Sequence, residues 1–194
     1  MTQQPNLLAV DWSKLPAPID DGAMVHLAGA RLPAVALRAT DGSPVTLAAL
    51  PGRVVVFAYP MTGRPGVPLP DGWDEIPGAR GCTPHSCAFR DHHAELLAAG
   101  ATRVFGLSTQ NTAFQREAAE RLHLPFPLLS DAGLEFANGA RLPTIEVAGS
   151  TLIKRFALVI DDGVVTQVFY PVFPPDANAG DVLAWLIASP RAKA

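Results

Sequence analysis

The stretch that decides the fold is RVVVFAY at residues 53–59, followed after a loop by GCTPHSCAFRDHH at residues 81–93. The first segment is β-branched and apolar on both faces, which predicts a buried central strand. The second predicts a helix over residues 82–99, with Gly100 as its stop signal. It also holds both cysteines of the chain, Cys82 and Cys87. The sequence therefore predicts a pair of thiols in a helix beside the central strand.

Strands and helices alternate on either side of this stretch. The predicted elements are a hairpin with strands near 32–37 and 45–47, a strand at 103–108, a helix at 111–123, a short helix at 134–140, a hairpin with strands at 151–160 and 164–170, and a closing helix at 181–189. This order favours an α/β fold with a central mixed sheet flanked by helices. Residues 1–25 are interpreted as an N-terminal arm and residues 26–194 as one domain.

Length and composition exclude several classes of protein. The chain has 194 residues, 48% of them hydrophobic, and a net charge of −3. It is long enough for one buried core, and it lacks the basic face expected of a nucleic-acid-binding protein. No apolar stretch is long enough to cross a bilayer, and the first residues lack the pattern of a secretory signal. We therefore expect a cytoplasmic protein with no membrane or nucleic-acid partner.

Residues 61–80 differ from the rest of the domain. They contain Pro65, Pro68, Pro70 and Pro77 together with Gly63, Gly66, Gly72 and Gly78. This composition is incompatible with a regular helix or a central strand, so it predicts a long loop insertion. Because the loop directly precedes Cys82, we expect it to form a wall or lid of the functional site.

Two cysteines are too few for a secreted disulfide scaffold, so in a reducing compartment the pair indicates transient redox chemistry or a metal site. A thiol in the first turn of a helix lies near unpaired backbone N–H groups and the positive end of the helix dipole. Both features favour the thiolate, which is the nucleophilic form. Cys82 is therefore the candidate nucleophile.

Gly81-Cys82-Thr83, with Cys87 and Phe89-Arg90-Asp91 behind it, resembles the active site of the Q-type peroxiredoxins, also called bacterioferritin comigratory proteins. The similarity extends to residues 32–42, 54–60, 105–108 and 125–131, whereas residues 154–163 are closer to the peroxiredoxin-5 class. The resemblance implies a thioredoxin-like fold without a metal or other cofactor. It also implies a thiol-dependent peroxidase that reduces hydrogen peroxide or organic hydroperoxides.

The resemblance assigns roles to individual residues. Cys82 would be the peroxidatic cysteine that becomes a sulfenic acid, and Cys87 the resolving cysteine that forms a disulfide with it. Thioredoxin or a similar dithiol would reopen the disulfide. Arg155 matches the family arginine that stabilises the thiolate and holds the peroxide oxygens. Because residues five apart do not face each other in a helix, the first turns must unwind before the disulfide forms.

The chain departs from the family pattern at one position. The family carries a threonine or serine three residues before the peroxidatic cysteine, where this chain has Ala79. Pro60 corresponds to the family proline, displaced by the insertion. Thr62, Thr83 or backbone N–H groups are candidates for the missing donor. We expect Thr62 to donate a hydrogen bond to the Cys82 thiolate or to the bound peroxide.

Other functions are compatible with parts of the sequence. One is a thioredoxin-like dithiol–disulfide oxidoreductase, although this class usually needs a Cys-x-x-Cys motif that the chain lacks. Another is a non-catalytic redox sensor on the same fold, which the absent hydroxyl at Ala79 favours. A zinc site made of His85, His92, His93 and the cysteines lacks the usual ligand spacing, so the histidines are interpreted as surface or packing residues. The sequence allows a monomer or a homodimer.

Overall fold

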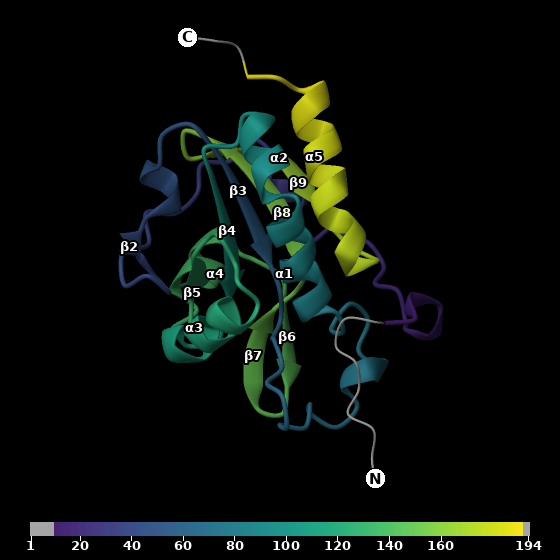
Figure 1. The fold of residues 1–194 in the computed structure, drawn as a ribbon. Helices are drawn as coiled ribbons and strands as arrows, with labels where there is room; N and C mark the ends of the chain where they lie inside the picture. Colours follow the sequence, from purple (N-terminus) through teal and green to yellow (C-terminus); the bar gives the residue numbers. More distant parts are fainter. Residues whose placement is uncertain (1–9, 192–194) are drawn as a thin grey trace.

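The structure, a computed structural model, describes residues 10–191. A mixed seven-stranded sheet runs through its centre (Figure 1), as predicted. In spatial order its strands are β2 (Pro44–Val45), β1 (Leu37–Ala39), β5 (Leu128–Ser130), β4 (Arg103–Ser108), β3 (Arg53–Ala58), β8 (Phe156–Asp161) and β9 (Val164–Phe169). β5, β4 and β3 run parallel to one another, and the remaining neighbours pair antiparallel. A separate hairpin consists of β6 (Thr144–Val147) and β7 (Ser150–Ile153).

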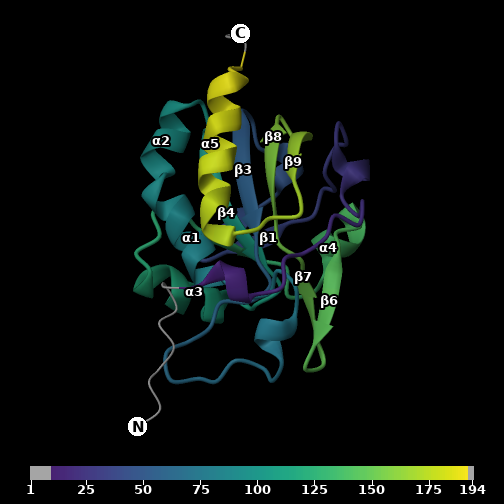
Figure 2. The same ribbon diagram turned by 90° about the vertical axis from the view of Figure 1, so that its right-hand side faces the viewer.

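Within the described residues, five α-helices surround this sheet. They are α1 (Cys82–Asp91), α2 (His93–Ala98), α3 (Thr112–Arg121), α4 (Glu135–Ala140) and α5 (Asn178–Ala188). Helices α1, α2 and α5 cover one face of the sheet (Figure 2), and α4 lies on the other. None of the helices in the described part of the chain has the length and apolarity needed to cross a membrane.

The central strand β3 explains why both faces need cover. Its side chains alternate, so that Val55 and Phe57 point into the core under α1 and α5, while Val54 and Val56 point into the core under α4. All four are buried. Such a strand can exist only with apolar layers on both sides, as its unbroken apolar sequence predicts.

Two predicted elements are divided in the structure. The helix expected over residues 82–99 breaks at His92, whose backbone (φ −90°, ψ 4°) leaves the helical region. The strand expected over residues 151–160 breaks at Lys154 and Arg155, because β7 pairs with β6 whereas β8 pairs with β3. The second break is important for the site, since it leaves Arg155 free of strand pairing.

The described part of the N-terminal arm lies against the C-terminal region. The Trp12 ring packs edge-on against Phe173, and its indole nitrogen donates to Asp176 at 3.0 Å. Residues 1–9 of the predicted arm lie outside the described residues. The closing helix α5 begins at Asn178, earlier than expected, because the 3₁₀ turn Pro175–Ala177 runs directly into it.

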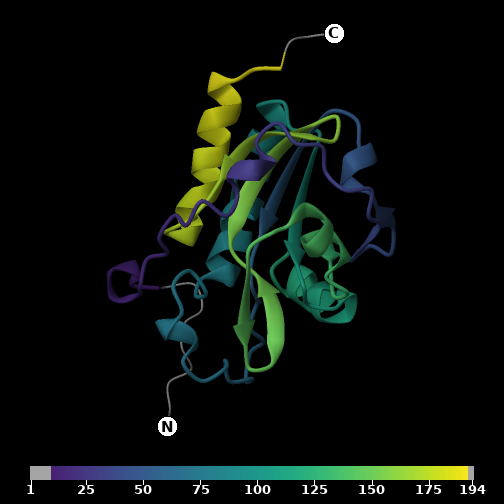
Figure 3. The same ribbon diagram turned by 180° about the vertical axis from the view of Figure 1, so that it is seen from behind.

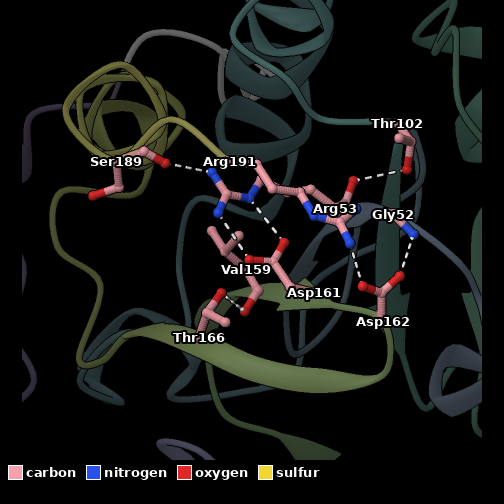
Figure 4. A network of polar contacts seen from close by, with 9 residues as sticks. All are labelled: Gly52, Arg53, Thr102, Val159, Asp161, Asp162, Thr166, Ser189 and Arg191. Atoms are coloured by element: carbon pink, nitrogen blue, oxygen red, sulfur yellow. Dashed lines mark hydrogen bonds and ion pairs between the residues drawn. The ribbon is translucent and has the colours of Figure 1, made fainter. Parts of the chain in front are cut away.

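The buried Arg53 side chain links β3, β8 and the residue that follows α5, at the end of the sheet where β3 begins (Figure 4). Arg53 begins β3 and donates from Nε and Nη2 to the two carboxylate oxygens of Asp161 on β8, each at 2.8 Å. Its Nη1 donates to the backbone oxygen of Ser189, just beyond α5. Hydrogen bonds from Arg53 hold the pKa of Asp161 below its usual value. This two-pronged pair is the geometry in which an ion pair contributes most.

We expect Asp161→Asn to lower the free energy of unfolding by about 1–3 kcal/mol, because it leaves a buried guanidinium without its carboxylate. Urea denaturation at neutral pH measures the change. Asp91→Asn is the matched control, since the Arg90–Asp91 pair is exposed and its loss should cost less than about 1 kcal/mol. Equal losses in the two variants would contradict the assignment.

Candidate active site

Cys82 is the first residue of α1, and the backbone conformation of the residue before it favours glycine. Gly81 adopts the left-handed conformation (φ 99°) that favours glycine. A Cβ atom at this position would lie 2.6 Å from the Trp12 ring and 2.8 Å from Pro175. The Cys82 side chain is 4% exposed, so its sulfur lies just beneath the surface at a helix N-terminus.

Arg155 reaches this sulfur from the break between β7 and β8. Its Nη2 donates to Cys82 Sγ at 3.2 Å. Three consecutive backbone oxygens hold the same guanidinium, those of Gly78, Ala79 and Arg80, at 3.1–3.3 Å. Arg155 is 3% exposed, so these contacts are made away from bulk water.

The charge of Arg155 has no acidic partner. In residues 10–191, none of the ion pairs involves Arg155, and its acceptors are backbone oxygens, an imidazole and the Cys82 sulfur. A buried cation is stable only when its surroundings supply polar or negative partners. An ionised Cys82 sulfur is the one group here that can supply full negative charge.

His85 makes polar contacts that its interpretation as a surface or packing residue does not include. It is fully buried, so it is not a surface residue, and both of its ring nitrogens lie within hydrogen-bonding distance of another side chain. Nδ1 lies 2.9 Å from Arg155 Nη1, and Nε2 lies 2.9 Å from Asn178 Oδ1. Because His85 is three residues after Cys82, it shares the face of α1 that carries the thiol. That spacing was a signal for His85, whereas no sequence signal pointed to Asn178.

These contacts fix the ionisation and tautomer of His85. A guanidinium can only donate, so Nδ1 is the acceptor and Nε2 carries the hydrogen that is donated to Asn178. Burial, and then the Arg155 charge, hold the pKa of His85 well below its usual range. His85 is therefore a neutral imidazole that accepts from Arg155.

Cys87 lies in the same helix and is also a free, buried thiol. Burial raises the pKa of the Cys87 thiol. A raised pKa favours the protonated thiol, which is a weaker nucleophile than a thiolate. This form is expected of a cysteine that reacts with a sulfenic acid and does not attack the peroxide itself. The hydroxyl of Ser86, between the two cysteines, donates back to the Cys82 carbonyl at 3.0 Å.

The expectation that Thr62 donates a hydrogen bond to Cys82 is not met in the structure. The Thr62 hydroxyl donates to Gln110 Oε1 at 3.1 Å rather than to Cys82, and the backbone N–H and C=O of Thr62 also pair with the Gln110 amide. This three-way pairing holds Thr62 against the end of β4. Thr83 lines the cavity beside Cys82, whereas Pro60 is buried and lines a different cavity, on the side of Arg155.

The absence of a hydroxyl at position 79 has a packing explanation. Ala79 is fully buried in an apolar cluster with Trp73 from the insertion and Val147 and Leu152 from the β6–β7 hairpin. A side-chain hydroxyl there would be surrounded by apolar groups. The backbone oxygen of Ala79 accepts from Arg155 and, at 3.5 Å, from the Cys82 thiol, so position 79 supplies an acceptor to the site and not a donor.

The insertion forms most of the wall over the thiol. A cavity of about 20 Å³, room for one water-sized molecule, opens onto Cys82. Its lining includes Met61, Gly63, Leu69, Trp73 and Arg80 from segment 61–80. Figure 3 shows this segment beside the β6–β7 hairpin, on which its apolar side chains pack. A hydrogen bond from the Arg80 guanidinium to the Asp74 carboxylate stabilises the end of the loop that lies nearest Cys82.

Comparison with known proteins places these features in a family. The Redoxin family pattern matches residues 27–183. Peroxiredoxin Q of Sedum lineare is 34% identical over 160 residues, covering 81% of this chain and 76% of the relative. The chain belongs to the peroxiredoxin Q group. The rice peroxiredoxin Q is 36% identical over 157 residues, and this chain spans 64% of its length.

Solved structures agree with this assignment of the fold. Peroxidoxin BcpB from Mycobacterium tuberculosis superposes with a TM-score of 0.68 at 31% identity, covering 85% of this peroxiredoxin and 98% of that chain. Peroxiredoxin Q from Xanthomonas campestris gives a TM-score of 0.65 at 25% identity, covering 83% and 97%. The thioredoxin-like peroxiredoxin fold is thus confirmed.

The buried neutral His85 predicts a pH dependence of stability. Its pKa is lowered by folding, so below about pH 6.5 the unfolded chain binds a proton that the folded chain does not. We expect the free energy of unfolding to fall between about pH 7.5 and about pH 5.5, and His85→Phe to remove most of that fall. Chemical denaturation at the two pH values tests this. His123→Phe is the control, because the His123 side chain is exposed. An unchanged pH dependence in His85→Phe would contradict the prediction.

Proposed function

We propose that this peroxiredoxin is a thiol peroxidase that reduces hydrogen peroxide or organic hydroperoxides. The observation that carries the proposal is the contact of 3.2 Å between the Arg155 guanidinium and the Cys82 sulfur at the start of α1. A thiol beside a buried cation and a helix N-terminus has the electrostatic surroundings of a reactive cysteine. The small cavity that opens onto it gives a peroxide room to approach.

In the first step, the Cys82 thiolate attacks one oxygen of the peroxide. A sulfur–oxygen bond forms, the O–O bond breaks, and the leaving oxygen takes up a proton to depart as water or an alcohol. Cys82 is oxidised to the sulfenic acid. Arg155 stabilises the attacking thiolate and the negative charge that develops on the peroxide oxygens through charge-assisted hydrogen bonds.

In the second step, the Cys87 thiol condenses with the sulfenic acid, releasing water and forming the Cys82–Cys87 disulfide. Both cysteines lie in α1, where residues five apart do not face each other. The turn between them must therefore open for the sulfurs to meet. An external dithiol then reduces the bridge by thiol–disulfide exchange.

The proposed partner is thioredoxin or a similar dithiol protein, acting where thiols are kept reduced. A cytoplasmic location fits this requirement, and the plant relatives are named as chloroplastic. The alternatives remain a dithiol–disulfide oxidoreductase and a non-catalytic redox sensor. Peroxide consumption by the purified protein separates the proposed peroxidase from both alternatives.

We expect Cys82→Ser to abolish peroxide reduction, because it removes the nucleophile. Cys87→Ser should retain one oxidation event per chain but lose turnover with thioredoxin, because no disulfide forms within the chain. Rapid mixing with peroxide measures the first oxidation, and a thioredoxin-coupled assay measures turnover. The reverse pattern, in which Cys82→Ser is oxidised and Cys87→Ser is not, would exchange the two roles.

The wall formed by segment 61–80 predicts a preference for small peroxides. Shortening Leu69, which lines the cavity, should raise the rate with cumene hydroperoxide relative to hydrogen peroxide by roughly three- to tenfold, equivalent to about 1 kcal/mol of relieved crowding. Val67→Ala is the control, since Val67 is on the same loop but 59% exposed. An unchanged ratio in Leu69→Ala would show that the insertion does not select among peroxides.

A further inference from the structure

We propose that His85 is a positioning residue that holds Arg155 against the Cys82 sulfur, and that Asn178 braces His85. The inference rests on the proposed function in one respect, that Arg155 acts on the Cys82 thiolate. It assigns a role in the site to α5, an element that carries neither cysteine nor Arg155.

The N–H groups of Arg155 meet different partners. Nε faces Gly78 O, and Nη2 faces the oxygens of Ala79 and Arg80 as well as the sulfur. Nη1 has a single hydrogen-bond partner within residues 10–191, which is His85. His85 is therefore the one side chain other than Cys82 that orients the guanidinium. Without it, Nη1 is a buried donor left unpaired.

The His85 ring cannot turn freely. It is fully buried and packs edge-on against Phe57, with ring centroids 5.0 Å apart, and against Phe89 at 5.3 Å. The remaining polar edge meets Asn178, the first residue of α5, which is itself 1% exposed. The amide oxygen of Asn178 fixes the tautomer in which Nδ1 accepts from Arg155.

The group that accepts from Arg155 Nη1 carries no charge. A carboxylate in place of His85 could also accept from Arg155, but it would compensate the charge of the guanidinium. The neutral imidazole aims Arg155 while leaving its positive charge available to the sulfur. His85 also lies between Cys82 and Cys87 in α1, so the unwinding that precedes the disulfide withdraws it from Arg155.

The experiment is a double-mutant cycle with His85→Phe and Arg155→Met. Phenylalanine keeps the aromatic packing but removes both hydrogen bonds. Two rates are measured for each variant, alkylation of Cys82 by iodoacetamide near neutral pH and the first oxidation by hydrogen peroxide. We expect His85→Phe alone to slow both by about tenfold. In the Arg155→Met background it should have no further effect, because His85 acts through Arg155.

A conservative variant separates positioning from packing. His85→Asn keeps an oxygen at the δ position to accept from Arg155, so it should recover most of the rate lost in His85→Phe. Asn178→Ala changes a residue outside α1. It should slow both reactions, but by less than His85→Phe does. If His85→Phe does not fold, Asn178→Ala replaces it as the test of the proposal. Circular dichroism and thermal unfolding check that the variants are folded.

The outcomes distinguish the two levels of inference. Wild-type rates in folded His85→Phe, or an equal slowing by His85→Phe with and without Arg155, would overturn the role of His85. Should the wild-type protein react slowly with peroxide while the alkylation cycle behaves as expected, the peroxidase function would fail and the positioning role would stand.

Discussion

The contact between the Arg155 guanidinium and the Cys82 sulfur is the interaction on which the rest of the site depends. A guanidinium with 3% exposure and no acidic partner among residues 10–191 needs other acceptors, and the surrounding chain supplies them. The backbone from Gly78 to Arg80 turns three consecutive oxygens toward it. The break between β7 and β8 frees Arg155 from strand pairing so that it can reach the sulfur.

The need for acceptors around Arg155 also explains the path of the insertion. Proline and glycine keep residues 61–80 irregular, and apolar side chains such as Trp73 fix that irregular path on the β6–β7 hairpin. Ala79 therefore combines two properties that a polar residue would not, a side chain that packs in the apolar cluster and a carbonyl that accepts from Arg155. In this geometry the Arg155 guanidinium is the group that donates to the Cys82 sulfur.

Helix α1 is subject to opposing demands. In the proposed mechanism, attack on a peroxide requires the first turn of α1 to be ordered, since that turn places Cys82 and His85 beside Arg155. The proposed disulfide between Cys82 and Cys87 requires the same turn to open. The contacts that stabilise the ordered form come from outside the helix: Trp12 and Pro175 press against Gly81, and Asn178 bonds His85. The N-terminal arm and α5 therefore help to keep the first turn of α1 ordered.

The sequence by itself determined the elements whose signals are local. The apolar run of β3, the helix α3 within residues 111–123 and the thiol at the start of α1 were all predicted and lie where expected. It did not reveal that residues 151–160 divide at Arg155, because the apolar residues on both sides of the break look like one strand until their different partners, β6 and β3, are known. Nor did it reveal the pairing of His85 with Arg155 and Asn178, which joins residues separated by 70 and 93 positions. Such contacts are decided only when the packed core brings distant segments together and removes water from polar groups that must then bond one another.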